Sequence, residues 1–278
     1  MCAASMQRTI CLLALVSGSL VGCGPMGVLT GPLEHQLVYQ PSGPAAPDFE
    51  TPNLEREDVW FESPDGAKLH GWYCPAKNPR GFVLFAHGNG GNLSSRWERY
   101  RLLANRLELT VLAFDYRGYG QSEGKPSEAG VMADARAARA FLATKAHVAE
   151  SEIILYGQSL GGAVMVELAS EDGAKALILE STFTSLADVA NFKFPLTPPG
   201  KILRNEFNSL AKIEQYRGPL LILHGDQDKL VPFDQAQRLY AAANEPKTFV
   251  TVHEGGHNWK PTLDVILGID QFLRKLPR

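Results

Sequence analysis

Three side chains of this chain could together carry out acyl transfer, and they occur in the order Ser159, Asp228, His257. A serine hydroxyl attacks a carbonyl carbon only when an imidazole takes its proton, and a carboxylate must hold that imidazole in the correct tautomer. Ser159 lies in Gly-Gln-Ser-Leu-Gly after an apolar run, a motif typical of a nucleophile on a sharp turn between strand and helix. This chemistry would pass through a covalent acyl-enzyme.

The acid and the base each have a neighbour of the same type. We favour Asp228 over Asp226 as the acid because its loop continues into Val-Pro, a well-placed turn, and we expect Asp226 to cap that loop. His257 lies in a glycine-rich loop that would let it reach Ser159. His253 falls at the end of a strand, where we expect it to be packed or at the surface.

Negative charge on the attacked carbonyl requires two backbone N–H donors, an oxyanion hole. We expect one donor from Leu160, the residue after the nucleophile, and the other from Asn89. Asn89 stands between two glycines, which permit close approach of the backbone to a ligand. His87, at the start of this loop, is expected to form hydrogen bonds within the loop.

The elements that must position these residues alternate along the chain. Five apolar runs, at 81–87, 110–114, 153–156, 176–179 and 220–223, indicate strands covered on both faces. Between and after them, helical patterns cover 94–107, 126–146, 160–170, 233–243 and 262–275, and a last strand covers 248–252. Residues 57–62 and 68–73 predict an antiparallel hairpin at the sheet edge. The pattern predicts an α/β fold, a mostly parallel sheet with helices on both faces.

Residues 181–215 interrupt this alternation with prolines and aromatic residues, and they predict a small cap over the mouth of the sheet. A structural excursion away from the site is the alternative. Phe183, Phe192 and Phe194 in this insertion, with Trp259 beside the base, are candidates for a substrate pocket, although aromatic residues there can equally be packing.

Other polar residues follow strand ends. We expect Asp115 and Arg117 to brace the oxyanion loop by hydrogen bonds, with substrate binding as the alternative. Cys74 follows the apolar end of a strand and is expected to pack there.

The first 22 residues predict a signal peptide, because the apolar run at 9–21 is too short to span a membrane. Leu-Val-Gly-Cys follows, which resembles a bacterial lipobox and implies that Cys23 is lipidated. Gly24 in place of aspartate resembles an outer-membrane lipoprotein, on the periplasmic side of a Gram-negative envelope. An ordinary secretory signal is the alternative. Residues 23–52 would then form a lipidated, proline-rich tether and 53–278 the folded domain.

Charge, histidine spacing and cysteine count give no sign of a nucleic-acid partner, a metal site or a disulfide. A net charge of −3 with both signs mixed gives no reason to expect nucleic acid as a partner. The seven histidines are dispersed without the paired spacing of metal ligands, so no metal or other cofactor is expected. Once the leader is removed and Cys23 acylated, Cys74 is the only thiol, and the domain must stand without an internal disulfide.

Five motifs in order resemble the α/β-hydrolases, most closely the Bem46/ABHD-like branch grouped with serine aminopeptidases of the S33 type. They begin at His87, Phe114, Gly157, Asp228 and Gly256. The resemblance implies Ser159 as nucleophile, with the acid, base and donors as above. Our leading hypothesis is a serine hydrolase that cleaves an ester or thioester. A serine aminopeptidase or amidase, and a non-catalytic binding or scaffold lipoprotein, are the alternatives. The natural substrate and the oligomeric state stay open.

Overall fold

The computed structural model describes residues 34–196 and 203–277. The predicted signal peptide at 1–22, the predicted lipidation site Cys23 and part of the predicted cap therefore lie outside the described residues. Within the described residues, none of the helices is both long enough and apolar enough to cross a bilayer.

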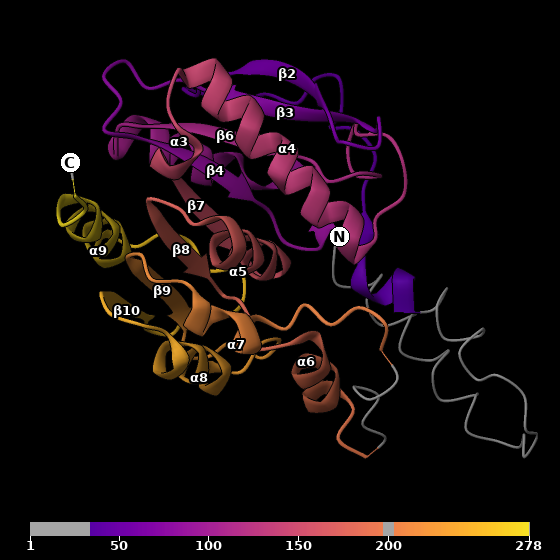
Figure 1. The fold of residues 1–278 in the computed structure, drawn as a ribbon, viewed down its shortest axis with the longest axis vertical. Coiled ribbons are helices and arrows are strands. Elements are labelled where there is room, and N and C mark those ends of the chain that lie inside the picture. The colour runs from indigo at the N-terminus through magenta and orange to yellow at the C-terminus, as the bar shows by residue number, and fades with distance from the viewer. Residues whose placement is uncertain (1–33, 197–202, 278) are drawn as a thin grey trace, which may run out of the picture.

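One eight-stranded sheet organises the domain (Figure 1), in the order β10-β9-β8-β7-β4-β6-β3-β2. Its strands are β2 (Glu57–Glu62), β3 (Lys68–Cys74), β4 (Gly81–Ala86), β6 (Leu109–Phe114), β7 (Ile153–Gln158), β8 (Ala176–Glu180), β9 (Leu220–Gly225) and β10 (Lys247–Val252). β2 pairs antiparallel with β3, and β3 with β6, while all other pairs are parallel. The predicted edge hairpin and the mostly parallel sheet are confirmed.

Helices cover both faces because successive side chains of a strand point to opposite sides. Leu155 of β7 belongs to the core cluster that includes buried residues of α4 (Glu128–Ala146), α5 (Leu160–Asp172) and α8 (Phe233–Ala242). Its neighbour Tyr156 belongs to the second cluster, with residues of α3 (Trp97–Arg106) and α9 (Leu263–Arg274). Each helix layer therefore buries one face of the sheet.

Helix ends follow ordinary capping rules. The Ser127 and Thr262 side chains accept hydrogen bonds from the N–H of Gly130 and Val265, so α4 and α9 begin close to where the sequence pattern predicts. The helix expected at 94–107 is instead divided into a 3₁₀ turn, η1 (Leu93–Arg96), and α3, since Asn92 caps the turn first.

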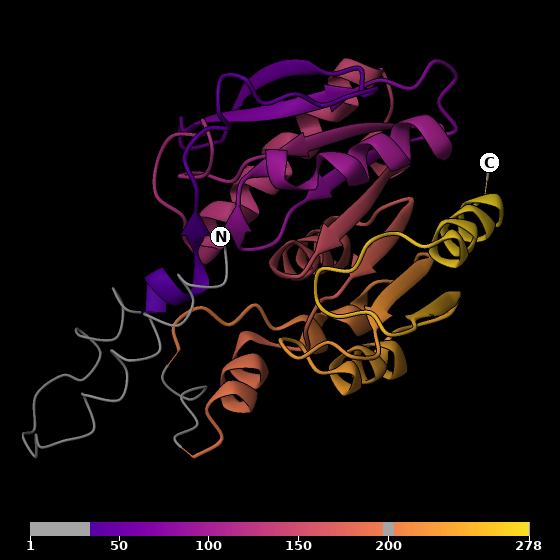
Figure 2. The same cartoon turned by 180° about the vertical axis from the view of Figure 1, so that it is seen from behind.

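The insertion expected at 181–215 contains α6 (Leu186–Lys193), α7 (Ser209–Lys212) and the turn η4 (Ile213–Gln215). Contacts of α7 with α5 and α8 make the second half of the insertion part of a helix layer. Figures 1 and 2 show α6 standing out from the body of the domain beside α7.

The start of the described chain lies against the insertion and the oxyanion loop. Buried Glu34 accepts hydrogen bonds from the backbone N–H of Arg204 (2.8 Å) and Asn205 (2.7 Å), where the chain returns from the insertion. Further along, β1 (Gln40–Pro41) pairs in parallel with β5 (Gly90–Gly91) in the loop after β4. The N-terminal segment thus holds both the returning end of the insertion and the loop after β4.

Candidate active site

Ser159 stands between β7 and α5 with a positive φ of 51° and ψ of −115°. Residues other than glycine rarely adopt this backbone conformation, and residues strained in this way cluster at functional sites. The turn is held because the Ser159 N–H donates to the Glu180 carbonyl (2.8 Å) and the Thr182 hydroxyl donates to the Ser159 carbonyl (2.8 Å). The backbone therefore fixes where the hydroxyl points.

The glycines of the motif are required by crowding. A Cβ on Gly157 would stand 2.3 Å from the Gly161 carbonyl oxygen, and one on Gly161 would stand 2.1 Å from the Ala86 oxygen. These distances are far inside van der Waals contact. The N-terminus of α5 is therefore packed directly on the end of β4, next to the predicted oxyanion loop.

The structure brings the three predicted residues together in one hydrogen-bonded chain. His257 Nε2 lies 3.1 Å from Ser159 Oγ, and His257 Nδ1 lies 2.7 Å from Asp228 Oδ2. Asp228 follows β9 and His257 follows β10. These strands are adjacent in the sheet, which brings the two residues together although they are 29 positions apart in the sequence. The arrangement has the geometry of nucleophile, base and orienting acid.

The second oxygen of Asp228 is also held. Its Oδ1 accepts the backbone N–H of Leu230 (2.8 Å) and Val231 (2.9 Å). Burial raises the pKa of Asp228, but the contact with His257 and these two N–H groups together lower it by more. The net pKa of Asp228 therefore lies below its ordinary value. Asp228 is thus kept as a carboxylate that can stabilise an imidazolium.

The acid loop and the base loop are joined by their backbones. The Asp226 N–H donates to the Val252 carbonyl (3.2 Å) and the Gln227 N–H to the Gly255 carbonyl (2.9 Å). A Cβ on Gly225 would come within 2.2 Å of the Gly255 oxygen. This contact fixes the spacing between acid and base.

The two rejected candidates have local roles. Asp226 caps the turn, because its carboxylate accepts the Glu254 N–H (2.8 Å) and lies 3.1 Å from His253 Nδ1. The His253 side chain is 85% exposed, in agreement with the surface position that was one of the two alternatives. Among the described residues, neither of the two forms a hydrogen bond or ion pair with Ser159.

The predicted oxyanion loop borders the nucleophile. A Cβ on Gly88 would lie 3.4 Å from Ser159 Cβ, so the loop backbone passes beside the serine. The Asn89 carbonyl accepts from the Tyr119 hydroxyl (2.8 Å), and its side chain donates to the Val38 carbonyl (3.1 Å). Within the described ranges, the backbone N–H groups of Asn89 and Leu160 donate to no protein acceptor. Both remain available to an incoming oxygen.

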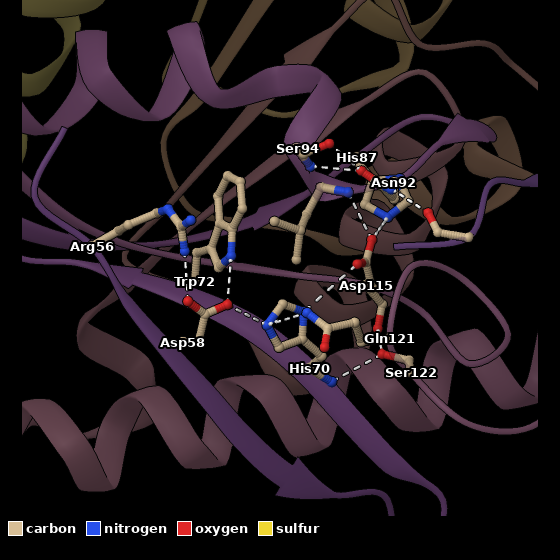
Figure 3. A network of polar contacts seen from close by, with 12 residues as sticks. Arg56, Asp58, His70, Trp72, His87, Asn92, Ser94, Asp115, Gln121 and Ser122 are labelled. Carbon is tan, nitrogen blue, oxygen red and sulfur yellow. Dashed lines mark hydrogen bonds and ion pairs between the residues drawn. The ribbon is translucent and has the colours of Figure 1, made fainter. Parts of the chain in front are cut away.

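Buried Asp115 braces this loop, as predicted. Its Oδ1 accepts the Leu93 N–H (2.7 Å) and lies 3.2 Å from Nε2 of His87, whose Nδ1 donates to the Gly88 carbonyl (2.7 Å). Figure 3 shows Asp115 between His87 and His70. Burial raises the pKa of Asp115, but these two histidines and the Leu93 N–H lower it more, and the net pKa falls below its ordinary value.

The network continues from His70 to the edge of the sheet. His70 Nε2 lies 2.7 Å from Asp58 Oδ1, which also accepts from Trp72 Nε1 (2.9 Å) (Figure 3). The sequence analysis did not identify His70 or Asp58. Their place on an edge hairpin gave no sign that they reach the residues behind the oxyanion loop.

The prediction that Arg117 also braces the oxyanion loop is wrong. Its guanidinium donates to Asp134 at 2.8 Å and to Asp65 at 2.6 Å, joining the hairpin turn to α4. Two carboxylates on the other side of the strand end hold this side chain away from the loop.

A buried ion pair positions the base loop, and the sequence analysis missed it. Glu180 accepts from Arg99 Nη2 (2.8 Å), the Tyr156 hydroxyl (2.7 Å) and Gln158 Nε2 (3.1 Å). Arg99 Nη2 also donates to the carbonyl of Trp259, two residues after His257 (2.6 Å). Glu180 follows the apolar run of β8, so the search for polar residues at strand ends could have found it.

The four aromatic pocket candidates do not meet on one wall. Phe183 is buried in the core cluster on the α5 side of the sheet, and Trp259 in the cluster on the α3 side, where its Nε1 donates to Ser181 Oγ (3.1 Å). Phe192 is 52% exposed at the end of α6, and Phe194 follows it, partly exposed. Phe192 and Phe194 alone of the four stand in the projecting part of the insertion.

Among the described residues no group of three or more His, Cys, Asp or Glu side chains could hold a metal ion. Cys74 is buried and unpaired, and burial raises the pKa of its thiol to about 12, so this residue packs as expected.

Comparison with known proteins places the chain in a family. A family model described as alpha/beta hydrolase domain matches residues 79–274. An uncharacterized protein of Mycobacterium tuberculosis, Rv2307c, is 39% identical over 247 residues, 87% of either chain. The alpha/beta hydrolase domain-containing protein WAV2 of Arabidopsis thaliana is 37% identical over 227 residues, 74% of this chain and 73% of that protein.

A solved structure gives the same fold. The esterase Pf2001 of Pyrococcus furiosus superposes with a TM-score of 0.68 at 20% identity, covering 86% of this chain and 98% of that one. At this identity the likeness concerns the fold.

Proposed function

The chain belongs to the alpha/beta hydrolase family, and from that premise we propose that it is a serine hydrolase that cleaves a carboxylic ester or thioester through an acyl-enzyme on Ser159. The observation that supports this most directly is the continuous chain from Ser159 Oγ through His257 to Asp228, at 3.1 and 2.7 Å. The Pyrococcus furiosus neighbour is described as an esterase, so esters are the first substrates to test.

In the proposed reaction, His257 Nε2 takes the proton of Ser159 Oγ as the oxygen attacks the carbonyl carbon. Asp228 stabilises the imidazolium that forms. The carbonyl oxygen becomes an oxyanion and receives the free N–H groups of Asn89 and Leu160. When the tetrahedral species collapses, His257 returns the proton to the departing alcohol or thiol.

In the second half of the reaction, water is the nucleophile and Ser159 is the leaving group. A water molecule gives a proton to His257 and attacks the acyl-enzyme carbonyl, and the same two N–H groups receive the second oxyanion. Collapse releases the carboxylic acid and returns the proton to Ser159. The strained turn favours both acylation and deacylation because it holds the Ser159 backbone in one position throughout.

Within the family, we assign the chain to the Bem46/ABHD-like branch on the motifs that begin at His87 and Gly157. A serine aminopeptidase or amidase would use the same three residues and is the alternative enzyme. Phe192 and Phe194 in the projecting insertion are the proposed contacts for an acyl chain. Replacing either with Ala should change the relative kcat/KM across acyl lengths by about 1–3 kcal/mol.

For location, we propose that Cys23 carries the lipid and that the domain works at the cell envelope. The supporting observation is the short apolar run that ends in Leu-Val-Gly-Cys. A lipid anchor would hold the site near acylated substrates at the membrane.

Labelling with a fluorophosphonate and hydrolysis of a series of 4-nitrophenyl esters test the proposed function. The wild-type protein should be labelled and should release 4-nitrophenol, whereas Ser159→Ala should do neither. Equal labelling of the two proteins would show that Ser159 is not the nucleophile. A labelled protein that cleaves amides and aminoacyl substrates but no ester or thioester would favour the peptidase.

A further inference from the structure

We propose that Arg96 binds a negatively charged group of the substrate, so that the preferred esters or thioesters carry a carboxylate or phosphate close to the scissile bond. This inference rests on the proposed function of Ser159 and adds the substrate class. The sequence analysis gave Arg96 no role. It lies at the end of η1, between the oxyanion loop and α3.

One nitrogen of Arg96 is fixed next to the nucleophile. Its Nε donates to Oε1 of Gln158 at 2.7 Å. Gln158 is buried, immediately precedes Ser159, and is itself held by Glu180 (3.1 Å). The planar guanidinium therefore has a defined place that a flexible surface arginine would lack.

The remaining two nitrogens border the site. Arg96 Nη2 and Ser159 Cβ each lie 3.4 Å from the position that a Cβ on Gly88 would occupy, so both atoms border the same small space beside Gly88. Arg96 Nη1 lies 3.8 Å from the corresponding position on Gly91. The guanidinium thus adjoins both the serine and the loop that contributes the oxyanion donor.

No carboxylate of the described residues pairs with Arg96, and its two η nitrogens donate no hydrogen bond there. The nearest carboxylate along this chain of contacts is Glu180, which is already paired with Arg99 (2.8 Å). Asp115, behind the oxyanion loop, faces His87 and His70 instead. Beside the serine, therefore, the described part of the chain shows a partly buried positive charge with free donors and no counter-ion.

Such a group recognises anions. Two parallel N–H donors match a carboxylate or a phosphate, and such charge-assisted hydrogen bonds are shorter and stronger than neutral ones. A charge-assisted contact of this kind should favour an anionic substrate by roughly 10–100-fold in kcat/KM over a neutral substrate of the same shape.

Two pairs of substrates test the proposal and separate the two sources of charge. In the acyl-side pair, the mono-4-nitrophenyl ester of adipic acid is compared with 4-nitrophenyl hexanoate. In the alcohol-side pair, the acetyl ester of glycerol 3-phosphate is compared with glycerol monoacetate. The wild-type protein should prefer the charged member of at least one pair, mainly through a lower KM, and added salt should reduce the preference.

Arg96→Gln should reduce that preference by about tenfold or more, and Arg96→Lys should retain part of it because the charge remains. Arg101→Gln, which removes the same charge from a guanidinium stacked on Trp97, is the matched control and should leave the preference unchanged. The inference would be overturned by absence of a preference in both pairs. It would also be overturned if Arg96→Gln slowed charged and neutral esters equally, which would mean that Arg96 only positions the turn.

Failure of the proposed function has a different signature. In that case the wild-type protein would neither react with fluorophosphonate at Ser159 nor cleave the neutral esters, and both proposals would fall. Cleavage of neutral esters without charge preference would overturn the role of Arg96 alone.

Discussion

Arg99 and Glu180 form a buried ion pair, 2.8 Å between Nη2 and Oε1, that connects the end of β8 to the loop carrying the base. The connection is made by Arg99, which also donates to the Trp259 carbonyl and lies over its ring, 4.4 Å from the centroid. Burial lowers the pKa of Arg99, but Glu180 raises it more, and the guanidinium stays charged. The position of His257 therefore depends on a side chain of α3, which packs on the same face of the sheet as Trp259.

Arg99→Met should destabilise the domain by about 3–5 kcal/mol, because it leaves the Glu180 carboxylate buried without its cation. Thermal and urea unfolding measure this change. Arg101→Met, on the same helix but stacked on Trp97, should cost about 1 kcal/mol or less. Equal effects of the two substitutions would contradict a special role for the pair.

Ser159, His257 and Asp228 should behave as one unit. Ser159→Ala or His257→Ala should each lower kcat by on the order of 10⁴–10⁶, and the double variant should lose little more, because neither group works without the other. Steady-state kinetics on a 4-nitrophenyl ester measures this non-additivity. Losses that multiply in the double variant would show that the two side chains act independently.

Exchanging the two aspartates for asparagine distinguishes the acid from the loop cap. Asp228→Asn should lower kcat by on the order of 10⁴, since the amide leaves His257 in the wrong tautomer. Asp226→Asn should keep most of the activity and reduce stability, because its carboxylate holds the Glu254 N–H. The opposite pattern would exchange the two assignments.

Asp115 should make the domain sensitive to acid. Its folded pKa is depressed, so its contribution to stability is complete above the unfolded value of about 3.9 and is lost as the pH falls through the lower folded value. Asp115→Asn lacks this contribution, and its stability deficit relative to wild type should therefore narrow between pH 5 and pH 2. Unfolding across this range measures the deficit, with the exposed Asp48→Asn as control. A stability deficit that does not change with pH would contradict the lowered pKa of Asp115.

Cys23→Ser should leave an unprocessed precursor that no longer partitions into detergent. The reason is that both the lipid and the cleavage site depend on this thiol in the proposed maturation. N-terminal sequencing and phase partitioning of whole-cell protein measure the result. A mature wild-type protein that begins elsewhere and stays in the aqueous phase would exclude the anchor.

The sheet could be predicted because its strands are continuous apolar runs that alternate with helical periods. Polar residues directly after those runs led to Ser159 and Asp228, since parallel strands end at one edge of a sheet. The same reasoning led to Asp115. This reasoning finds residues that lie close together because the parallel strands all end at the same edge of the sheet.

The residues that hold the site were harder to find for a physical reason. Arg99 and Arg96 come from a helix and a 3₁₀ turn, where an arginine is most often a solvated surface residue. Arg117 follows a strand end, yet its direction was decided by Asp134 and Asp65, which belong to other elements. Side-chain direction of this kind follows from three-dimensional neighbours and leaves no periodic trace in the sequence.

The hydrogen bonds from Arg204 and Asn205 to Glu34 have a practical consequence for producing the protein. A recombinant domain shortened to begin near residue 53, where the folded domain was expected to start, would lack this carboxylate and the short strand at Gln40–Pro41. Protease sensitivity should then increase first at the returning segment around Arg204, and the segment at Gly90–Gly91 should lose its pairing partner. Expression that begins at or before Glu34 keeps both attachments.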